Sequence, residues 1–363
     1  MPSVNLAIIA AAGAGKTRRI VREALKSSER AALVTFTLEN VEHIRREIYK
    51  EAGAIPPNVE VWPWFTFLIH ELARPYQTAI CTNRIDGLTL VNDRSARYVR
   101  EDKDPIRFYF ADGRNIYSDK LARFACVCNE RTGGRVIRRL EERFDHIYID
   151  EVQDLAGYDL DVLRLLLGAK TKLTVVGDHR QATLTTNNAS RNKGYARSQI
   201  VRKLEEWKQE GLLDIDYATD TYRSNQVIAT FADTLFPDQP TTTSRNELVT
   251  GHDGVFSIGF AEVTAYVEKY GPQALRLDKR TDCAGLAAMN YGVSKGRTFD
   301  RVLIFLHKGG AKWIASGDFK HIAAATTKTK MYVGFTRARH SLTFVVDGDV
   351  SVANVVPYTI GKA

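Results

Sequence analysis

The strongest constraint on the fold lies at the start of the chain, where an apolar stretch runs into a loop of small residues and then into a helical segment. Residues 6–10 are Leu-Ala-Ile-Ile-Ala, residues 11–17 are Ala-Ala-Gly-Ala-Gly-Lys-Thr, and residues 18–26 carry a helical pattern. Small residues allow such a loop to turn its N–H groups toward phosphate oxygens, and the following helix adds its positive N-terminal end. The pattern therefore predicts a buried strand, a phosphate-binding loop and a helix.

The loop also predicts the chemistry of its ligand. The predicted phosphate-binding residues are Gly13, Ala14, Gly15, Lys16 and Thr17. Lys16 can reach the β- and γ-phosphates of a nucleotide, and the Thr17 hydroxyl can bind Mg²⁺. The full pattern asks for Gly at position 10, where this chain has Ala10. A Gly-rich turn that merely starts a helix is the alternative.

A second apolar stretch, residues 144–149, ends on two adjacent carboxylates, Asp150 and Glu151. In many nucleotide hydrolases, an apolar strand that ends on Asp-Glu holds a metal ion and polarises a water molecule. Gln153 and Asp154 narrow this interpretation, because an acidic pair followed by Gln-Asp is much rarer than a bare Asp-Glu. Together with the loop upstream, the pattern indicates an ATP-driven nucleic-acid motor.

Strand and helix signals alternate along the chain, which predicts an α/β fold with parallel sheets wound on both sides. A length of 363 residues leaves room for two domains. We expect one domain over residues 1–190, with a small insertion near residues 74–143, and a second domain over residues 191–363. The polar stretch 183–193 is the predicted linker.

Composition favours a polyanionic partner, because the net charge is +8 and the sequence pI is about 9.2. No apolar run approaches the roughly 20 residues of a membrane span, and the N-terminus lacks the layout of a secretory signal. We therefore expect no membrane partner and a cytoplasmic location. We expect reduced thiols at the four cysteines, which lack zinc-type spacing: Cys81, Cys126, Cys128 and Cys283.

Further motifs occur in a fixed order along the chain. The full series is AAAGAGKT at 10–17, LVTFT at 33–37, IDEVQD at 149–154, GDHRQ at 177–181, YRS at 222–224, SKGRTFD at 294–300 and YVGFTRAR at 332–339. In this order the motifs resemble those of the superfamily 1 helicases, specifically the UvrD/Rep/PcrA-like group. The resemblance runs from residue 10 to about residue 346 and is weak between about residues 74 and 130.

The resemblance implies two RecA-like domains with ATP bound in the cleft between them. Lys16 and Thr17 would hold the phosphates and Mg²⁺, and Asp150 would anchor the metal through water. Glu151 would be the general base that orients the attacking water, and Gln181 would connect the γ-phosphate to the nucleic-acid site.

In the second half of the chain, the resemblance implies three more contacts to the nucleotide. Tyr222 would stack on adenine. Arg223 and Arg337 would reach across the cleft as γ-phosphate clamps, so that hydrolysis depends on closure.

The resemblance also implies a single-strand channel lined by Thr35 and Phe36 and by the stretch Trp64, Phe65 and Thr66. Aromatic side chains in such a channel stack on bases of any sequence, at ~1–3 kcal/mol each. The alternative is that these aromatic side chains pack in the core, where Trp and Phe are also common.

The chain departs from the family pattern on the nucleic-acid and accessory side. Only residues 1–5 precede the first strand, where relatives carry a Gln-containing segment that recognises adenine, so we expect relaxed NTP specificity. Gln181 is not followed by the usual stacking aromatic, and Arg297 replaces a Glu that touches the ribose. The stretch 224–290 is too short for the large inserted domain of relatives. These departures spare the hydrolytic residues and favour ATP hydrolysis over processive unwinding.

We therefore expect an ATP-dependent DNA helicase or translocase that uses ATP and Mg²⁺ and acts on single-stranded DNA or a tailed duplex, with 3′-to-5′ polarity by family analogy. One alternative is a helicase-like, ATP-binding regulatory subunit that senses DNA and controls a protein partner, such as a nuclease, in repair, replication or phage defence. A further alternative is RNA as the substrate.

Overall fold

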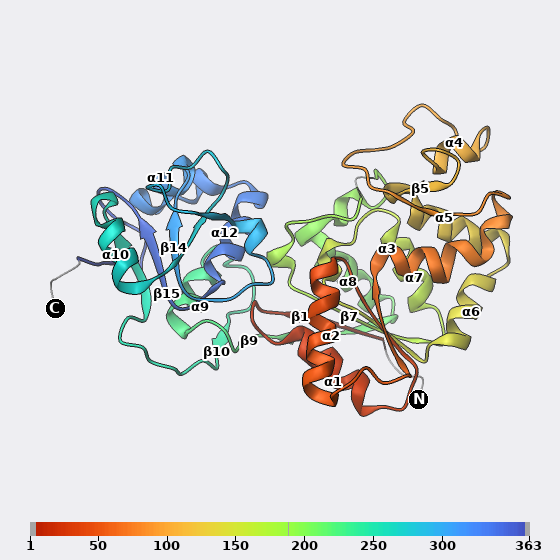
Figure 1. Cartoon of the computed structure of the whole chain (residues 1–363), viewed down its shortest axis with the longest axis horizontal. Coiled ribbons are helices and arrows are strands. Elements are labelled where there is room, and N and C mark those ends of the chain that lie inside the picture. The colour runs from red at the N-terminus through yellow and green to blue at the C-terminus, as the bar shows by residue number, and fades with distance from the viewer. Residues whose placement is uncertain (1–4, 188, 360–363) are drawn as a thin grey trace. The chain divides into compact units, whose positions relative to one another are not determined.

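Two six-stranded sheets organise the chain, one in each of the two units into which its internal contacts divide it (Figure 1). The computed structural model describes residues 5–187 and 189–359. The first unit comprises residues up to Ile9 together with Lys16–Tyr217, and the second comprises Ala10–Gly15 and the residues from Ala218 onward. By its contacts, the loop after the first strand is thus grouped with the second unit.

The first sheet is built from strands that lie far apart in the sequence. They are β1 (Asn5–Ala10), β2 (Ala31–Thr35), β3 (Val59–Pro63), β6 (His146–Ile149), β7 (Lys172–Gly177) and β8 (Leu213–Ala218). The order is β3-β2-β6-β7-β1-β8; β2 pairs in parallel with β3 and β6, and β7 pairs in parallel with β6 and β1. Every residue of β2 and β6 is buried, so helices must cover both faces of the sheet.

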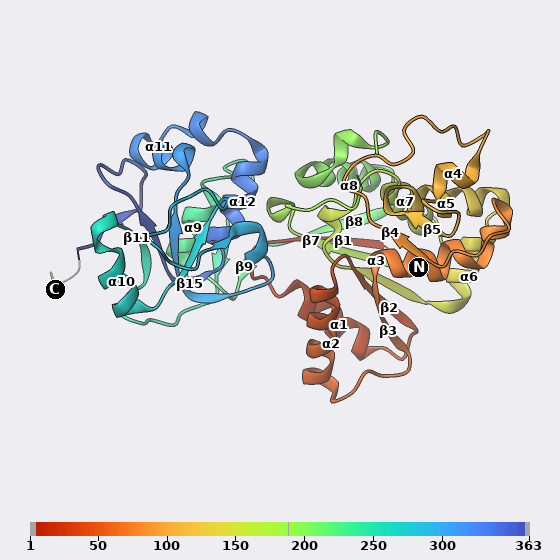
Figure 2. The same ribbon diagram turned by 45° about the horizontal axis from the view of Figure 1, so that its top comes forward.

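The described part of the first unit contains eight α-helices. They are α1 (Lys16–Lys26), α2 (Leu38–Ala52), α3 (Trp64–Phe67), α4 (Pro105–Tyr109), α5 (Ser118–Arg131), α6 (Arg135–Arg143), α7 (Asp159–Leu167) and α8 (Ile200–Gln209). Local sequence sets the ends of α2: the Thr37 hydroxyl accepts a hydrogen bond from the Asn40 N–H, and Gly53 ends the helix at φ 74°. Helices α1 and α2 lie side by side (Figure 2).

The predicted insertion near residues 74–143 is not a separate body. It contains a small sheet, β4 (Gly87–Thr89) paired in parallel with β5 (Asn115–Tyr117), and it includes α4, α5 and α6. Leu121 and Phe124 of α5 and Leu140 of α6 are buried in the same hydrophobic core as the strands of the first sheet. The insertion therefore shares one core with the sheet.

The first unit also continues past the predicted boundary at residue 190, to Tyr217. Leu204 and Trp207 of α8 and Leu213 of β8 belong to its core. The polar stretch predicted as a linker includes two buried residues, Thr186 and Asn187. The polar side chains of Thr186 and Asn187 form buried hydrogen bonds with the backbone of Ala156, so these two residues are packed into the first unit and do not form a linker.

The second unit has a parallel sheet of the order β13-β12-β14-β15-β11-β16. Its strands are β11 (Gly254–Ile258), β12 (Gln273–Arg276), β13 (Met289–Asn290), β14 (Phe299–Phe305), β15 (Ala338–Val345) and β16 (Val356–Pro357), and a separate pair joins β9 (Asp220–Thr221) to β10 (Thr243–Ser244). Its helices are α9 (Gln226–Asp233), α10 (Val263–Tyr270), α11 (Lys308–Ser316) and α12 (Ala325–Phe335).

The predicted fold class, α/β with two parallel sheets, is thereby confirmed. No helix in the described part of the chain is both long and apolar enough to cross a membrane.

Candidate active site

Three neighbouring strands of the first sheet bring the predicted hydrolytic residues to one edge. β6, β7 and β1 are adjacent and parallel, so their carboxyl ends lie on the same side of the sheet. Asp150 follows β6, Asp178 follows β7, and the predicted phosphate-binding loop follows β1. In parallel sheets this edge is where ligands bind.

Thr17 and Asp150 form the first contact of the site. The Thr17 hydroxyl lies in the first turn of α1 and donates to Asp150 Oδ2 at 2.8 Å. Burial and the neighbouring charge of Glu151 raise the pKa of Asp150 to about 6, against the hydrogen bond from Thr17 and the positive charge of Lys16. Lys16, Thr17 and Asp150 are therefore close together, as the sequence predicts.

Glu151 is held in a backbone conformation that is unusual for its residue type. Its φ is 60°, in the left-handed region, which costs an L-residue with a Cβ roughly 1–2 kcal/mol. Its backbone N–H donates to Asp150 Oδ1 at 2.9 Å, and its carboxylate accepts a hydrogen bond from the Gln153 side-chain amide. Such strain is concentrated at functional sites, where the surroundings hold the residue in place.

Gln153 connects Glu151 to the next strand. The Asp178 N–H donates to Gln153 Oε1 at 3.1 Å, so one buried side chain bridges the residues that follow β6 and β7. Gly177 makes room for this bridge, because a Cβ at that position would lie 2.2 Å from Gln153 Oε1. The sequence marked Gln153 as diagnostic but assigned it no role; the structure shows it as the support of Glu151.

Asp178 is the third acidic residue of the site, and sequence analysis did not select it. Gln181 Nε2 donates to Asp178 Oδ2 at 2.7 Å, and Arg180 Nε lies 3.3 Å from Asp178 Oδ1. Although burial opposes it, the charges of Arg180 and Lys16 hold the pKa of Asp178 below its usual value. The predicted sensor Gln181 is itself buried and tied to this carboxylate. The Gly-Asp pair after an apolar strand was the signal that could have identified Asp178.

The donor set at this edge suits Mg²⁺, which prefers hard oxygen ligands and uses few from the protein. The Thr17 hydroxyl and the Asp150 carboxylate already lie within hydrogen-bonding distance of each other. Over the described ranges, no group of three or more His, Cys, Asp or Glu side chains forms a metal cage. The arrangement therefore fits a metal that shares its coordination with phosphates and water.

The phosphate-binding loop contacts residues of the second unit, with which it is grouped. The Thr221 hydroxyl donates to the Ala12 carbonyl at 2.6 Å, and the Tyr222 N–H donates to the Gly13 carbonyl at 3.0 Å. Gly13 has φ 78°, and a Cβ there would lie 2.6 Å from Arg223 Cβ. Gly13 is therefore required both by its backbone conformation and by this close approach.

The other tip residues of the loop complete a tight turn. The Ala14 N–H donates to the Ala11 carbonyl at 3.2 Å, and Gly15 has φ 72° with open space where a Cβ would be. Gly15 immediately precedes α1, so its left-handed conformation forms the entry to the helix.

The predicted contacts of the second unit differ in their exposure. Tyr222 is 62% exposed, which leaves its ring accessible to a ligand. Arg223 Nη1 donates to the Thr336 carbonyl at 3.1 Å, which brings Arg223 next to Arg337. Arg337 is 1% exposed and donates from Nε to the Val333 carbonyl at 2.9 Å. Its role on phosphate therefore stays a prediction, and in this structure it holds the end of α12.

The predicted strand-binding residues divide into two groups. Trp64 and Thr35 are each 1% exposed, and Trp64 Nε1 donates to Asp159 Oδ1 at 2.9 Å. Trp64 is therefore a core residue, which corrects its prediction as a base-stacking side chain, and Thr35 is likewise buried. Phe36 and Phe65 are half-buried and pack edge to face at 5.7 Å. The remaining predicted residue, Thr66, is also half-buried.

The site combines a loop of small residues, a Thr–Asp pair and a Glu held by a neighbouring Gln, all at the carboxyl ends of neighbouring parallel strands. This combination is typical of the P-loop nucleotide hydrolases. Within that class, residues 112–192 match the family model of the UvrD/REP helicase N-terminal domain. The matched segment contains Asp150, Glu151, Gln153, Asp178 and Gln181. The match confirms the resemblance to the superfamily 1 helicases that the motifs indicate.

Solved structures that are similar to the chain include viral helicases. The helicase of PRRSV is 15% identical with a TM-score of 0.46, over 94% of this chain and 52% of that one. The arterivirus nonstructural protein 10 (helicase) in complex with DNA is 12% identical with a TM-score of 0.48, over 94% of this chain and 60% of that one. This chain thus spans between half and two thirds of the length of these proteins. A comparison with curated protein sequences finds no match.

Proposed function

We propose that this chain hydrolyses ATP and uses the energy to move along, or to open, nucleic-acid strands. The observation that supports this most directly is the continuous line of contacts from Thr17 through Asp150 and Glu151 to Gln153 and Asp178. Phosphoryl transfer needs groups that place a metal, a water and a phosphate, and this line of contacts offers candidates for the metal and the water at one sheet edge. Most of this line lies in the segment that matches the UvrD/REP model.

We assign the residues the following roles within this proposal. Mg²⁺, when bound, supplies positive charge to the phosphates. Lys16 and Thr17 bind the phosphate end of ATP, and Asp150 orients the Thr17 hydroxyl and the metal ligands. Glu151 accepts a proton from the attacking water, and Gln153 keeps its carboxylate in place for that step. Tyr222, Arg223 and Arg337 remain the proposed contacts to adenine and to the γ-phosphate.

Single-stranded DNA or a tailed duplex is the proposed substrate, with 3′-to-5′ polarity by analogy with the family. Phe36, Phe65 and Thr66 are the proposed contacts to the strand, because each is partly exposed at or just after the carboxyl ends of β2 and β3. Two aromatic rings that already contact each other offer a rigid surface to a base.

An ATPase assay with and without single-stranded DNA and RNA, over the four NTPs, tests this proposal. We expect hydrolysis that increases with single-stranded DNA. E151Q should bind ATP and fail to hydrolyse it, whereas E142Q, the same change at an exposed carboxylate earlier in the chain, should hydrolyse normally. Normal turnover by E151Q would remove Glu151 as the base, and a rate that no strand changes would remove the motor.

The second candidate function is a helicase-like regulatory subunit that senses DNA and controls a partner such as a nuclease. The burial of Trp64 favours it, because one of the predicted stacking contacts to a strand is missing. A helicase assay with the purified chain alone, ATP, Mg²⁺ and a tailed duplex separates the two functions. Unwinding, or displacement of streptavidin from a DNA end, by the isolated chain would argue against the regulatory function, and DNA-stimulated hydrolysis without either would support it.

A further inference from the structure

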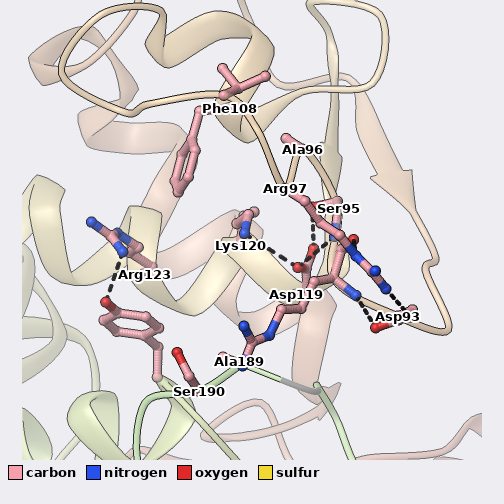
Figure 3. Close-up of a pocket in the computed structure, with 13 residues that line it drawn as sticks. Asp93, Ser95, Ala96, Arg97, Phe108, Asp119, Lys120, Arg123, Ala189 and Ser190 are labelled. Carbon is pink, nitrogen blue, oxygen red and sulfur yellow. Dashed lines mark hydrogen bonds and ion pairs between the residues drawn. The ribbon is translucent and has the colours of Figure 1, made fainter.

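A cavity of about 510 Å³ lies in the first unit, apart from the hydrolytic residues at the sheet edge (Figure 3). It is formed by the loop that precedes α4, by α4 and α5, by Tyr158 just before α7, and by Ala189 and Ser190. The lining residues are Asp93, Arg94, Ser95, Ala96, Arg97, Val99, Phe108, Asp119, Lys120, Arg123, Tyr158, Ala189 and Ser190. Its volume falls within the range of about 300–1,000 Å³ that is typical of ligand sites.

Positive charge predominates around this cavity. Its cationic residues are Arg94, Arg97, Lys120 and Arg123, against the carboxylates of Asp93 and Asp119. Residues 74–143 as a whole carry 15 Lys and Arg and ten Asp and Glu, so this part of the chain contributes +5 of the total charge of +8. The ligand that such a surface attracts is an anion.

Buried hydrogen bonds hold the wall of the cavity in place. Asp119, at the start of α5, accepts from the Ser95 N–H at 3.1 Å and from the Ser95 hydroxyl at 2.6 Å. These bonds fix the loop that carries Arg94 and Arg97. Lys120 Nζ lies 3.5 Å from Asp119 Oδ2 and 4.6 Å from the centre of the Phe108 ring. The cations are therefore positioned before any ligand arrives.

Arg123 provides a planar surface in the same cavity. Its guanidinium lies 5.2 Å from the centres of both the Phe108 and the Tyr158 rings, and its Nη1 donates to the Tyr158 hydroxyl at 2.9 Å (Figure 3). Glu101 forms an ion pair with it. A guanidinium fixed in this way can stack on a nucleobase and face a phosphate at the same time.

A second cavity of about 800 Å³ shares Val99, Phe108 and Arg123 with the first. The charged residues that only this cavity adds are Arg100, Glu101, Asp102, Glu130 and Arg131. With the shared Arg123, this cavity has three guanidiniums against three carboxylates, so it has no excess of positive charge to attract a phosphate. Of the two cavities, the first is therefore the one that suits an anionic ligand.

We propose that the cavity lined by Arg94, Arg97, Lys120 and Arg123 binds a phosphate of a nucleic-acid strand and the nucleotide attached to it. It is an accessory strand site, additional to Phe36 and Phe65, and it rests on the proposed function. The phosphate contacts the cations of the loop and of α5, and the base packs against the Arg123 plane.

The test measures binding of a short, labelled oligo(dT) to the full chain by fluorescence anisotropy over a series of salt concentrations. Arg94 and Arg97 are both exposed, so R94Q/R97Q should fold normally, which a thermal melt checks. The matched control is R107Q/R114Q, which removes the same charge from exposed side chains of the same region outside both cavities. A parallel titration uses dTMP, which separates a strand from a free nucleotide.

Each neutralised phosphate on a single strand contributes about 0.7 to the slope of log K against log salt, and the proposed site neutralises one, so R94Q/R97Q should lower that slope by about 0.7 and weaken binding several-fold. R107Q/R114Q should keep the wild-type slope. An unchanged slope in R94Q/R97Q, an equal loss in the control, or a loss of dTMP binding with the strand unaffected would each overturn the site. Failure of the proposed motor function gives a different result from failure of this site. In that case the wild-type chain still binds the strand, but the strand does not stimulate its ATPase activity.

Discussion

Replacing Gln153 with Met removes both hydrogen bonds that connect Glu151 to Asp178 while nearly keeping the side-chain volume. The Asp178 N–H is left without its side-chain acceptor in a buried setting, at about 1–3 kcal/mol, and the Glu151 carboxylate loses a charge-assisted bond of about 1.5–3 kcal/mol. If that second bond positions Glu151 in the transition state, its loss lowers kcat by about 10- to 150-fold. Added together, these losses should lower the free energy of unfolding by about 2.5–6 kcal/mol.

Gln77 offers a matched control, because it is also buried and also makes two hydrogen bonds: Nε2 donates to the Asn83 carbonyl at 2.9 Å, and Oε1 accepts from the Ile85 N–H at 3.0 Å. Urea unfolding and steady-state ATPase at saturating ATP are measured on Q153M and Q77M. Both variants should lose stability, and only Q153M should lose kcat. If Q153M keeps its kcat, Gln153 is a structural residue and Glu151 is positioned by other contacts.

Three further predictions test the structure, one on a buried carboxyl group, one on the strand site and one on a buried glycine. Burial raises the pKa of Asp159 to about 6, so its carboxyl keeps its proton to a higher pH in the folded chain than in the unfolded chain. The contribution of this carboxyl to stability is therefore fully present below about pH 4 and is lost as the pH rises through 6. The difference in unfolding free energy between the wild type and D159N should therefore change by on the order of 2–3 kcal/mol between pH 4 and 7 in chemical denaturation, and a constant difference would contradict this. Trp64→Phe should lower the free energy of unfolding by about 1.5–3 kcal/mol without changing strand affinity. Phe65→Ala should weaken strand binding by ~1–3 kcal/mol in anisotropy titrations. The opposite pattern would place Trp64 in the strand site. Gly334→Ala should lower the melting temperature, with a loss of about 1–3 kcal/mol in the free energy of unfolding, because its Cβ would lie 2.6 Å from the Tyr291 ring. Adding Tyr291→Leu to the same chain should recover part of that loss. If the effects of the two substitutions simply add, the clash is refuted.

The parts of the site that could be predicted from sequence are those that local pattern determines. A strand that ends on Asp150 and Glu151 places both at the carboxyl edge of its sheet wherever that strand lies. A Lys and a Thr after a small-residue loop start a helix for the same local reason. These residues therefore lie where the sequence predicts them.

The remainder depends on contacts between distant segments, which no local pattern contains. Trp64 is buried because Asp159, 95 residues later, accepts its indole N–H. Arg337 is buried because backbone carbonyls of α12 and of the loop before β14 surround it. The first unit extends to Tyr217 because β8 joins the edge of a sheet whose other strands end much earlier. Polarity alone predicted a linker where buried hydrogen bonds fix a segment.

The position of β1 has a consequence for synthesis of the protein. β1 is made long before its neighbours in the sheet, which are β7 and β8, and β8 ends at Ala218. At about 5–20 residues per second, roughly 10–40 s pass before the second partner strand is made. Until β7 is made, the apolar β1 has both hydrogen-bonding edges open, and the edge that β8 covers stays open for the whole of that time; an open edge is the condition for pairing with another chain. We therefore expect chaperones that bind β1 during synthesis, and slower growth at low temperature, to raise the yield of folded protein.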